Sequence, residues 1–247
     1  MFPKVIHTCW FQGLGNAPDG LDRMPCRWEL LNPGWTVRVW DEGTLTAFIQ
    51  REHPTWFVDW LGLSSVIKKC DLARLLLLWT YGGFYADLDI EPLRSLDSFL
   101  HSGERRFNRA INTRKLLDEH AFPERVDYLQ AEWILSREYR PIDNTGFGIA
   151  NGVMFVKQHS DLLLGYLHSR RGLGHLEVLE AFGPFALTRF IRENFEAVRG
   201  RVLVLPPSYL LWEDSAFDHS PPGFTVARHL AKNYWGDKAK KEWWKTH

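Results

Sequence analysis

Two aspartates separated by one residue, Asp87 and Asp89, are the side chains of this sequence whose type and spacing first suggest chemistry. They follow an apolar run at residues 84–86, which we predict to be a buried strand. In open α/β sheets, ligands bind beyond the carboxyl ends of the strands. Two carboxylates at such an end suit Mg²⁺ or Mn²⁺, which can hold a diphosphate and neutralise it as it leaves. The bare motif also fits two solvated turn residues, because roughly one Asp-x-Asp pair is expected by chance in a chain of this length.

A second charged pair, Asp71 and Arg74, precedes the aspartates and lies on one face of a predicted helix at residues 64–81. The C-terminal half of this helix is apolar around most of its circumference, so we expect it to be buried. A buried pair needs partners. The two side chains could satisfy each other, or they could bind a sugar hydroxyl and a phosphate oxygen. The residues alone leave both interpretations open.

Two aromatic residues near these charges have the same ambiguity. Tyr85 stands in the predicted strand before Asp87, and Trp10 ends a predicted first strand. The Tyr85 hydroxyl could reach a phosphate, and the Trp10 ring could stack on a base. Taken alone, each is more simply explained as a core residue.

The elements that must position these residues alternate in a strand–helix rhythm, which predicts an α/β fold with a largely parallel sheet. We expect one domain over residues 1–247. The stretch at residues 105–140 is the least regular and is highly charged, and we interpret it as a surface insertion over the sheet, helical in part. Predicted strands are residues 4–10, 35–40, 84–86, 149–156, 201–205 and 224–227; predicted helices are residues 22–31, 43–51, 64–81, 161–170 and 184–198.

Composition excludes some classes of protein. Lys+Arg and Asp+Glu both total 30, so bulk charge does not favour a nucleic-acid partner. The 3 cysteines have no paired spacing, which argues against a disulfide framework. We find no secretory signal and no apolar run long enough for a transmembrane segment, so we expect a cytoplasmic protein. The tail at residues 238–245 is basic and aromatic and is compatible with peripheral membrane contact.

The spaced pattern of residues 69–74, Leu77 and residues 81–89 closely resembles the sugar-binding region of the family 32 glycosyltransferases. It is also similar to the donor site of the large clostridial glucosylating toxins. Further similarity lies in residues 3–10, in residues 32–41, and in Asn151 with Gly152. The resemblance is dense from residue 3 to about residue 100 and thinner afterwards.

This resemblance implies a GT-A fold, a retaining reaction, and Mn²⁺ or Mg²⁺ as cofactor. The donor would be a nucleoside-diphosphate sugar, UDP- in preference to GDP-, bound by residues 1–100. Residues 101–247 would supply the acceptor side, for a glycan, a lipid-linked or another hydroxyl acceptor. The implied catalytic residues are Asp87, Asp89 and Arg74; the implied donor-binding residues are Trp10, Asp71, Arg74, Tyr85, Asp87, Asn151 and Trp235; the implied metal ligands are Asp89, Asp87 and His229.

The sequence departs from the family near its end, where Tyr234, preceded by Asn233, replaces a serine before Trp235. Two other functions stay open, the first favoured by this departure and the second by the paired aspartates. One is a GT-A scaffold that binds a nucleotide-sugar or glycan with little turnover. The other is a metal-dependent phosphohydrolase, which the lack of further acidic or histidine clusters for a second metal disfavours.

Overall fold

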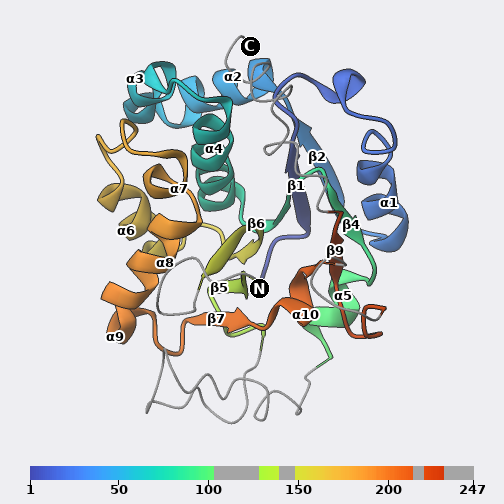
Figure 1. Ribbon diagram of the computed structural model, residues 1–247. Coiled ribbons are helices and arrows are strands. Elements are labelled where there is room, and N and C mark those ends of the chain that lie inside the picture. Colours follow the sequence, from blue (N-terminus) through green and yellow to red (C-terminus); the bar gives the residue numbers. More distant parts are fainter. Residues whose placement is uncertain (103–127, 139–147, 214–219, 231–247) are drawn as a thin grey trace.

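The computed structural model describes residues 1–102, 128–138, 148–213 and 220–230 of the chain. Within these residues, a central sheet of 6 strands has the order β2-β1-β3-β6-β5-β7 (Figure 1). The strands are β1 (Val5–Cys9), β2 (Thr36–Trp40), β3 (Gly83–Ala86), β5 (Trp133–Arg137), β6 (Ile149–Val156) and β7 (Val202–Leu205).

The sheet is mostly parallel, as the sequence predicts, with β6 as the exception. β1 pairs in parallel with β2 and β3, and β5 pairs in parallel with β7. β6 lies antiparallel between β3 and β5. The carboxyl ends of β1, β3 and β5 therefore meet the amino end of β6 at one edge of the sheet, which is where polar side chains of distant segments can converge.

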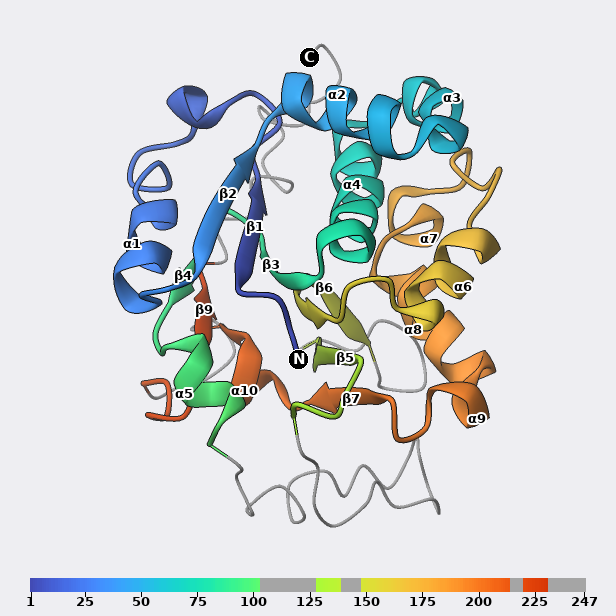
Figure 2. The same ribbon diagram turned by 180° about the vertical axis from the view of Figure 1, so that it is seen from behind.

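Helices cover both faces of the sheet (Figures 1 and 2). Alternation along β3 divides the core between these faces, since Tyr85 packs into one hydrophobic cluster while Phe84 and Ala86 pack into the other. The first cluster contains residues of α2 (Glu42–Glu52), α3 (Pro54–Gly62), α4 (Val66–Tyr81), α6 (Asp161–Ser169), α7 (Val178–Ala181), α8 (Pro184–Glu193) and α9 (Phe195–Val198). The second contains residues of α1 (Met24–Leu31), α5 (Leu96–Leu100) and α10 (Pro207–Leu210).

A small second sheet adjoins the second cluster and follows the Asp-x-Asp motif directly. Its strands have the order β4-β9-β8, where β4 is Ile90–Pro92, β9 is Ala227–His229 and β8 is Trp212–Glu213. Ile90 pairs with His229 in the antiparallel register of β4 and β9. This pairing brings a residue near the end of the described chain beside the motif. A short 3-10 helix, η1 (Leu14–Asn16), lies in the loop after β1.

Helix α4 carries Asp71 and Arg74 into the interior. Ser65 caps its first turn by accepting a hydrogen bond from the backbone N–H of Ile67, and Gly82 ends it at a φ of 64°. Gly83, with a φ of 95°, then starts β3 so close to β1 that a Cβ would lie 2.4 Å from the Val5 carbonyl oxygen. The expected helix stop is confirmed, and its second glycine also has a packing role.

Several expectations need correction. The segment interpreted as a surface insertion holds β5, an inner strand of the sheet; its Trp133-Ile134-Leu135 run is short and flanked by charged residues, so it resembles an amphipathic surface segment. The helix expected at 184–198 breaks at Asn194 into α8 and α9. The last strand begins at Ala227 rather than at residue 224. Helix α3 was not predicted from the sequence. No helix in the described ranges is long and apolar enough to span a bilayer.

Candidate active site

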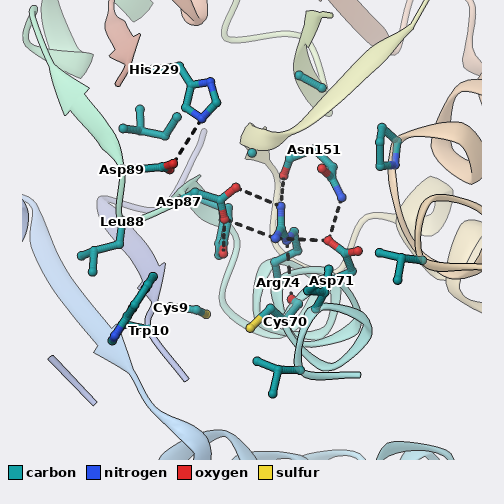
Figure 3. Close-up of a pocket in the computed structure, with 18 of the residues that line it drawn as sticks. Cys9, Trp10, Cys70, Asp71, Arg74, Asp87, Leu88, Asp89, Asn151 and His229 are labelled. Atoms are coloured by element: carbon teal, nitrogen blue, oxygen red, sulfur yellow. Dashed lines mark hydrogen bonds and ion pairs between the residues drawn. The ribbon is translucent and has the colours of Figure 1, made fainter. Parts of the chain in front are cut away.

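A pocket of about 800 Å³ opens where the strand ends converge. Its walls come from the ends of β1, β3 and β5, the start of β6, one side of α4 and the second sheet. Most of the residues that the sequence analysis singled out line it, and Figure 3 shows how they face one another. These are Trp10, Asp71, Arg74, Tyr85, Asp87, Asp89, Asn151 and His229.

The Arg74 guanidinium is the centre of the polar network. Its Nη2 lies 3.1 Å from Oδ1 of Asp71 and 3.2 Å from Oδ1 of Asp87, and its Nη1 donates to the Asn151 carbonyl oxygen at 2.7 Å (Figure 3). The guanidinium also lies over the Tyr85 ring, with its carbon 4.8 Å from the ring centroid. Only 4% of the Arg74 side chain is exposed, so this cation is held in place by groups of the protein itself.

Asp71 is fixed from two sides and is almost fully buried. Besides the ion pair with Arg74, its Oδ1 accepts a hydrogen bond of 2.9 Å from Nδ2 of Asn151. Burial raises the pKa of the Asp71 carboxyl to about 6, although the Arg74 charge opposes the shift. The ion pair between Asp71 and Arg74 is therefore present, and both residues line the pocket; their binding of a sugar hydroxyl and a phosphate oxygen stays a prediction.

Asp87 is oriented by Tyr85 and Gly152, in addition to its ion pair with Arg74. The Tyr85 hydroxyl donates to its Oδ1 at 2.8 Å, and its backbone N–H donates to the Gly152 carbonyl oxygen at 2.9 Å. A Cβ at Gly152 would lie 2.9 Å from Oδ2 of Asp87, so a glycine is needed there for the carboxylate to sit where it does. Burial raises the pKa of Asp87; Arg74 opposes the shift and the negative charge of Asp89 adds to it.

Asp89 faces the second sheet, where Nε2 of His229 lies 3.3 Å from its Oδ2 (Figure 3). The backbone supports this contact, since Leu230 N–H donates to the Asp89 carbonyl oxygen at 3.0 Å. Burial lowers the pKa of His229, but the hydrogen bond and the charge of Asp89 outweigh it, so the net shift is upward. The proximity of His229 to the motif, which resemblance alone suggested, is present in the fold.

The chemistry of the pocket walls fits a divalent cation bound together with a phosphate ligand. The carboxylates of Asp87 and Asp89 are groups that bind Mg²⁺ or Mn²⁺, and the His229 imidazole beside Asp89 is a group that binds transition-metal ions. No group of three or more histidine, cysteine, aspartate or glutamate side chains in the described ranges forms a preassembled metal cluster. Mg²⁺ is commonly held by one or two carboxylates plus substrate phosphates, so a full protein cage is not required. Which of the three side chains would bind the cation stays a prediction.

Trp10 follows the last residue of β1 and is half-buried. Its ring packs with Leu88 in a small hydrophobic cluster, beside the Asp-x-Asp motif (Figure 3). Its backbone N–H donates to the Trp40 carbonyl oxygen at 2.9 Å, which fixes the chain where β1 ends. The predicted stacking residue is therefore part of the pocket wall. Trp235, the other aromatic residue expected at the donor, lies outside the described residues, as do Asn233 and Tyr234.

The pocket also has polar wall residues that the sequence analysis missed. Glu138 follows β5, and burial raises the pKa of its carboxyl, an effect that His229 opposes and Glu213 reinforces. Its position at the strand edge could have been predicted only if β5 had been recognised. Gln12 lines the pocket next to Trp10, but a glutamine after a strand carries no signal in a single sequence. The two cysteines that line it, Cys9 and Cys70, are free thiols whose pKa values burial raises.

Comparison with known proteins agrees with this geometry. Residues 18–106 match the family model described as "Glycosyltransferase sugar-binding region containing DXD motif". An inositol phosphoceramide mannosyltransferase of Schizosaccharomyces pombe is 27% identical over 106 residues, which are 40% of this chain and 27% of the relative. A glycosyltransferase of Aspergillus fumigatus is 39% identical over 104 residues, 38% of this chain and 27% of the relative. The chain thus matches little more than a quarter of the length of these two relatives.

Solved structures extend the similarity beyond the matched region at the level of the fold. The PaToxG glycosyltransferase superimposes with a TM-score of 0.50 at 16% identity, covering 79% of this chain and 71% of that one. The ligand-free glycosyltransferase domain of the YGT toxin gives a TM-score of 0.50 at 11% identity, covering 83% and 80%. Residues 18–106 therefore match a glycosyltransferase sugar-binding region that contains a DXD motif, and the chain that carries them has the GT-A fold.

Proposed function

We propose that this protein is a metal-dependent, retaining glycosyltransferase that transfers a hexose from a nucleoside-diphosphate sugar, a UDP-sugar in preference to a GDP-sugar, to an acceptor hydroxyl. The observation that carries the proposal is the convergence of Asp71, Arg74, Asp87 and Asp89 in one pocket at the carboxyl edge of the sheet. Several relatives are named as mannosyltransferases, which supports a hexose donor. The resemblance to family 32 supports retention and the choice of UDP.

The charge of the pocket supports a cation requirement. Among the described residues, Arg74 is the one arginine or lysine in the wall, and it is shared between two carboxylates. A diphosphate that entered this pocket alone would meet a field of negative charge. The acidic wall residues are Asp71, Asp87, Asp89, Glu138, Glu177 and Glu213.

The chain's own residues divide the work by position. Asp71 and the Asn151 amide would orient sugar hydroxyls, a role that their shared position in the pocket wall and their 2.9 Å hydrogen bond support. Asp89 and Asp87 would hold the cation, with His229 beside Asp89. A divalent cation bound there would supply Lewis-acid stabilisation of the leaving diphosphate. Arg74 keeps Asp71 and Asp87 at fixed orientations, so the polar site is organised before the donor arrives.

Turnover assays with and without Mn²⁺ test the proposal. Wild-type protein, Asp89→Asn and Asp161→Asn are incubated with UDP-glucose, UDP-galactose and GDP-mannose, and release of UDP or GDP is measured. Asp161 is an exposed carboxylate at the start of α6, so its variant is the matched control. We expect Mn²⁺-dependent release in wild type and in Asp161→Asn, and a loss of roughly a hundredfold or more in Asp89→Asn, as for removal of a major electrostatic group.

Two outcomes would end the proposal: release that is indifferent to EDTA, or release that Asp89→Asn leaves intact. The anomeric configuration of the product, read by NMR, separates retention from inversion. For the acceptor, we propose a glycan, lipid-linked or similar hydroxyl compound, since the wall residues that the structure describes are mostly acidic where they are charged and so do not favour a polyanion.

Tyr234, which stands before Trp235 in place of the family's serine, favours a second candidate function. This is a module that binds a nucleotide-sugar without turning it over. Calorimetry beside the turnover assay distinguishes the two. Micromolar binding of a donor with no product, in the presence of acceptor candidates, would favour the module.

A further inference from the structure

The side chain of Gln12 is an anomaly in the wall of this pocket. Its amide nitrogen and its amide oxygen are both buried, and neither has a hydrogen-bond partner among the described residues. Buried polar groups nearly always have a partner, so an amide with neither end satisfied calls for an explanation. Gln12 lines the same pocket as Asp87 and Asp89.

The backbone that presents Gln12 is held firmly. The N–H of Gly13 donates to the Trp10 carbonyl oxygen at 2.9 Å, and the N–H of Glu42 donates to the Phe11 carbonyl oxygen at 2.9 Å. The Asn16 side-chain amide donates to the Gln12 carbonyl oxygen at 2.7 Å. An unsatisfied amide on a fixed backbone is preorganised for a ligand, because little conformational freedom is lost when the ligand binds.

We propose that the Gln12 amide pairs with the hydrogen-bonding edge of the donor's nucleobase, while Trp10 covers the face of the base. The inference rests on the proposed function, which places a nucleoside diphosphate in this pocket. Gln12 and Trp10 stand two residues apart after β1 and line the same pocket as the Asp71, Arg74 and Asn151 network that would meet the sugar.

The chemistry of the amide selects this ligand group. A primary amide offers one acceptor and two donors in a plane, which complements the adjacent donor and acceptor of uracil or guanine. A phosphate would leave the amide oxygen unpaired and would lack a positive charge beside it. A base therefore satisfies both ends of Gln12, and a pocket built to form such bonds rejects analogues that cannot make them.

Calorimetry in the presence of Mn²⁺ tests the pairing. Wild-type protein, Gln12→Met and the control Gln50→Met are titrated with UDP, with N3-methyl-UDP and with inorganic pyrophosphate. Gln50 is an exposed glutamine of α2, so the same substitution there leaves the pocket unchanged. If GDP rather than UDP binds wild type, GDP and N1-methyl-GDP replace the uridine ligands.

We expect Gln12→Met to bind UDP about tenfold more weakly than wild type, the size of one or two neutral hydrogen bonds, and to bind pyrophosphate equally well. N3-methyl-UDP should lose about the same factor with wild type. The two losses should not add, so Gln12→Met should no longer distinguish UDP from its methylated analogue. Gln50→Met should match wild type throughout.

Undiminished UDP binding by Gln12→Met, or a variant that still prefers UDP to the analogue, would overturn the inference and leave the proposed function standing. Wild type that binds neither UDP nor GDP would remove the proposed function, and the inference with it. The melting temperature of the ligand-free variant gives an independent check. Methionine of similar length replaces an amide with no partner, so the melting temperature should stay equal or rise; a marked fall would mean that the amide has a structural partner and would contradict the pairing.

Discussion

Replacing Arg74 with methionine removes the cation at the centre of the polar network while keeping an unbranched side chain. Asp71, whose side chain is 5% exposed, would lose the partner that lies 3.1 Å away. Breaking a buried ion pair by removing one partner costs about 3–5 kcal/mol. The Asp87 side chain is 35% exposed, so losing its 3.2 Å contact adds only about 0–1 kcal/mol. We expect Arg74→Met to lower the free energy of unfolding by about 4 kcal/mol near neutral pH.

The loss should depend on pH in a defined direction. In wild type, burial has raised the pKa of Asp71 from 3.8 to about 6, so the folded state binds a proton more readily than the unfolded state and stability falls as pH rises through that window. Without Arg74 the folded pKa rises further. The difference between variant and wild type should therefore be nearly constant below pH 6 and grow above it, by up to about 1.4 kcal/mol per pH unit.

Urea unfolding at pH 5, 6, 7 and 8 measures both effects. Arg189→Met is the matched control, because Arg189 forms an exposed ion pair with Glu180 and its removal should cost less than about 1 kcal/mol. The double variant Arg74→Met/Asp71→Asn, which has no buried carboxylate to leave unpaired at residue 71, should be more stable than Arg74→Met by at least about 1 kcal/mol. Equal costs for Arg74→Met and the control, or a double variant whose two losses simply add, would refute the reasoning.

Three further changes test other parts of the molecule. Gly152→Ala places a methyl group 2.9 Å from Oδ2 of Asp87. Initial rates of donor turnover should fall roughly tenfold or more, while the free energy of unfolding in urea changes by less than about 1 kcal/mol. Unchanged rates would show that the position of the Asp87 carboxylate is unimportant for turnover. In Gly83→Ala the added methyl group would lie 2.4 Å from the Val5 carbonyl oxygen, on a residue with a φ of 95°. Unfolding followed by circular dichroism should show that the free energy of unfolding falls by at least about 3 kcal/mol, or that the variant does not fold. A normal melting curve would contradict this prediction. Burial lowers the pKa of His7 from 6.5 to about 3, so the stability that neutral His7 contributes is complete above pH 6.5 and falls with decreasing pH by up to about 1.4 kcal/mol per pH unit. The variant His7→Gln should flatten this slope of unfolding free energy between pH 7 and 5. Identical slopes in the variant and in wild type would exclude His7 as the origin.

The parts of the fold that the sequence predicts are those with strong local signals. Helix α4 combines a capping serine, a long apolar surface and a terminal Gly-Gly pair, so both of its ends were predicted to within two residues. β1 and β6 are buried runs bounded by turn residues, and β6 was predicted with its observed limits. Strand direction has no such local signal, because the antiparallel course of β6 follows from its partners in the sheet.

The site divides in a similar way. Asp71, Arg74, Tyr85 and Asp87 come from one continuous segment, so helix spacing and the strand that follows already place them together. The hydrogen bonds of Asp71 and Arg74 to Asn151, and the contact between Asp89 and His229, join segments far apart in the chain. Only the resemblance to a family pointed to Asn151 and His229. Glu138 was missed because β5 was hidden in a charged stretch.

The distribution of charge also changes the role that can be given to Arg74. On sequence alone, its guanidinium could be expected to neutralise a departing diphosphate. In the folded protein, Nη2 faces Asp71 and Asp87, and Nη1 is bonded to a backbone carbonyl. A buried cation that already balances two carboxylates has little positive field left for a third anion. Arg74 is therefore better understood as the group that holds the acidic wall together. Under the proposed function, a divalent cation would supply the positive charge that the described wall residues do not offer to a diphosphate.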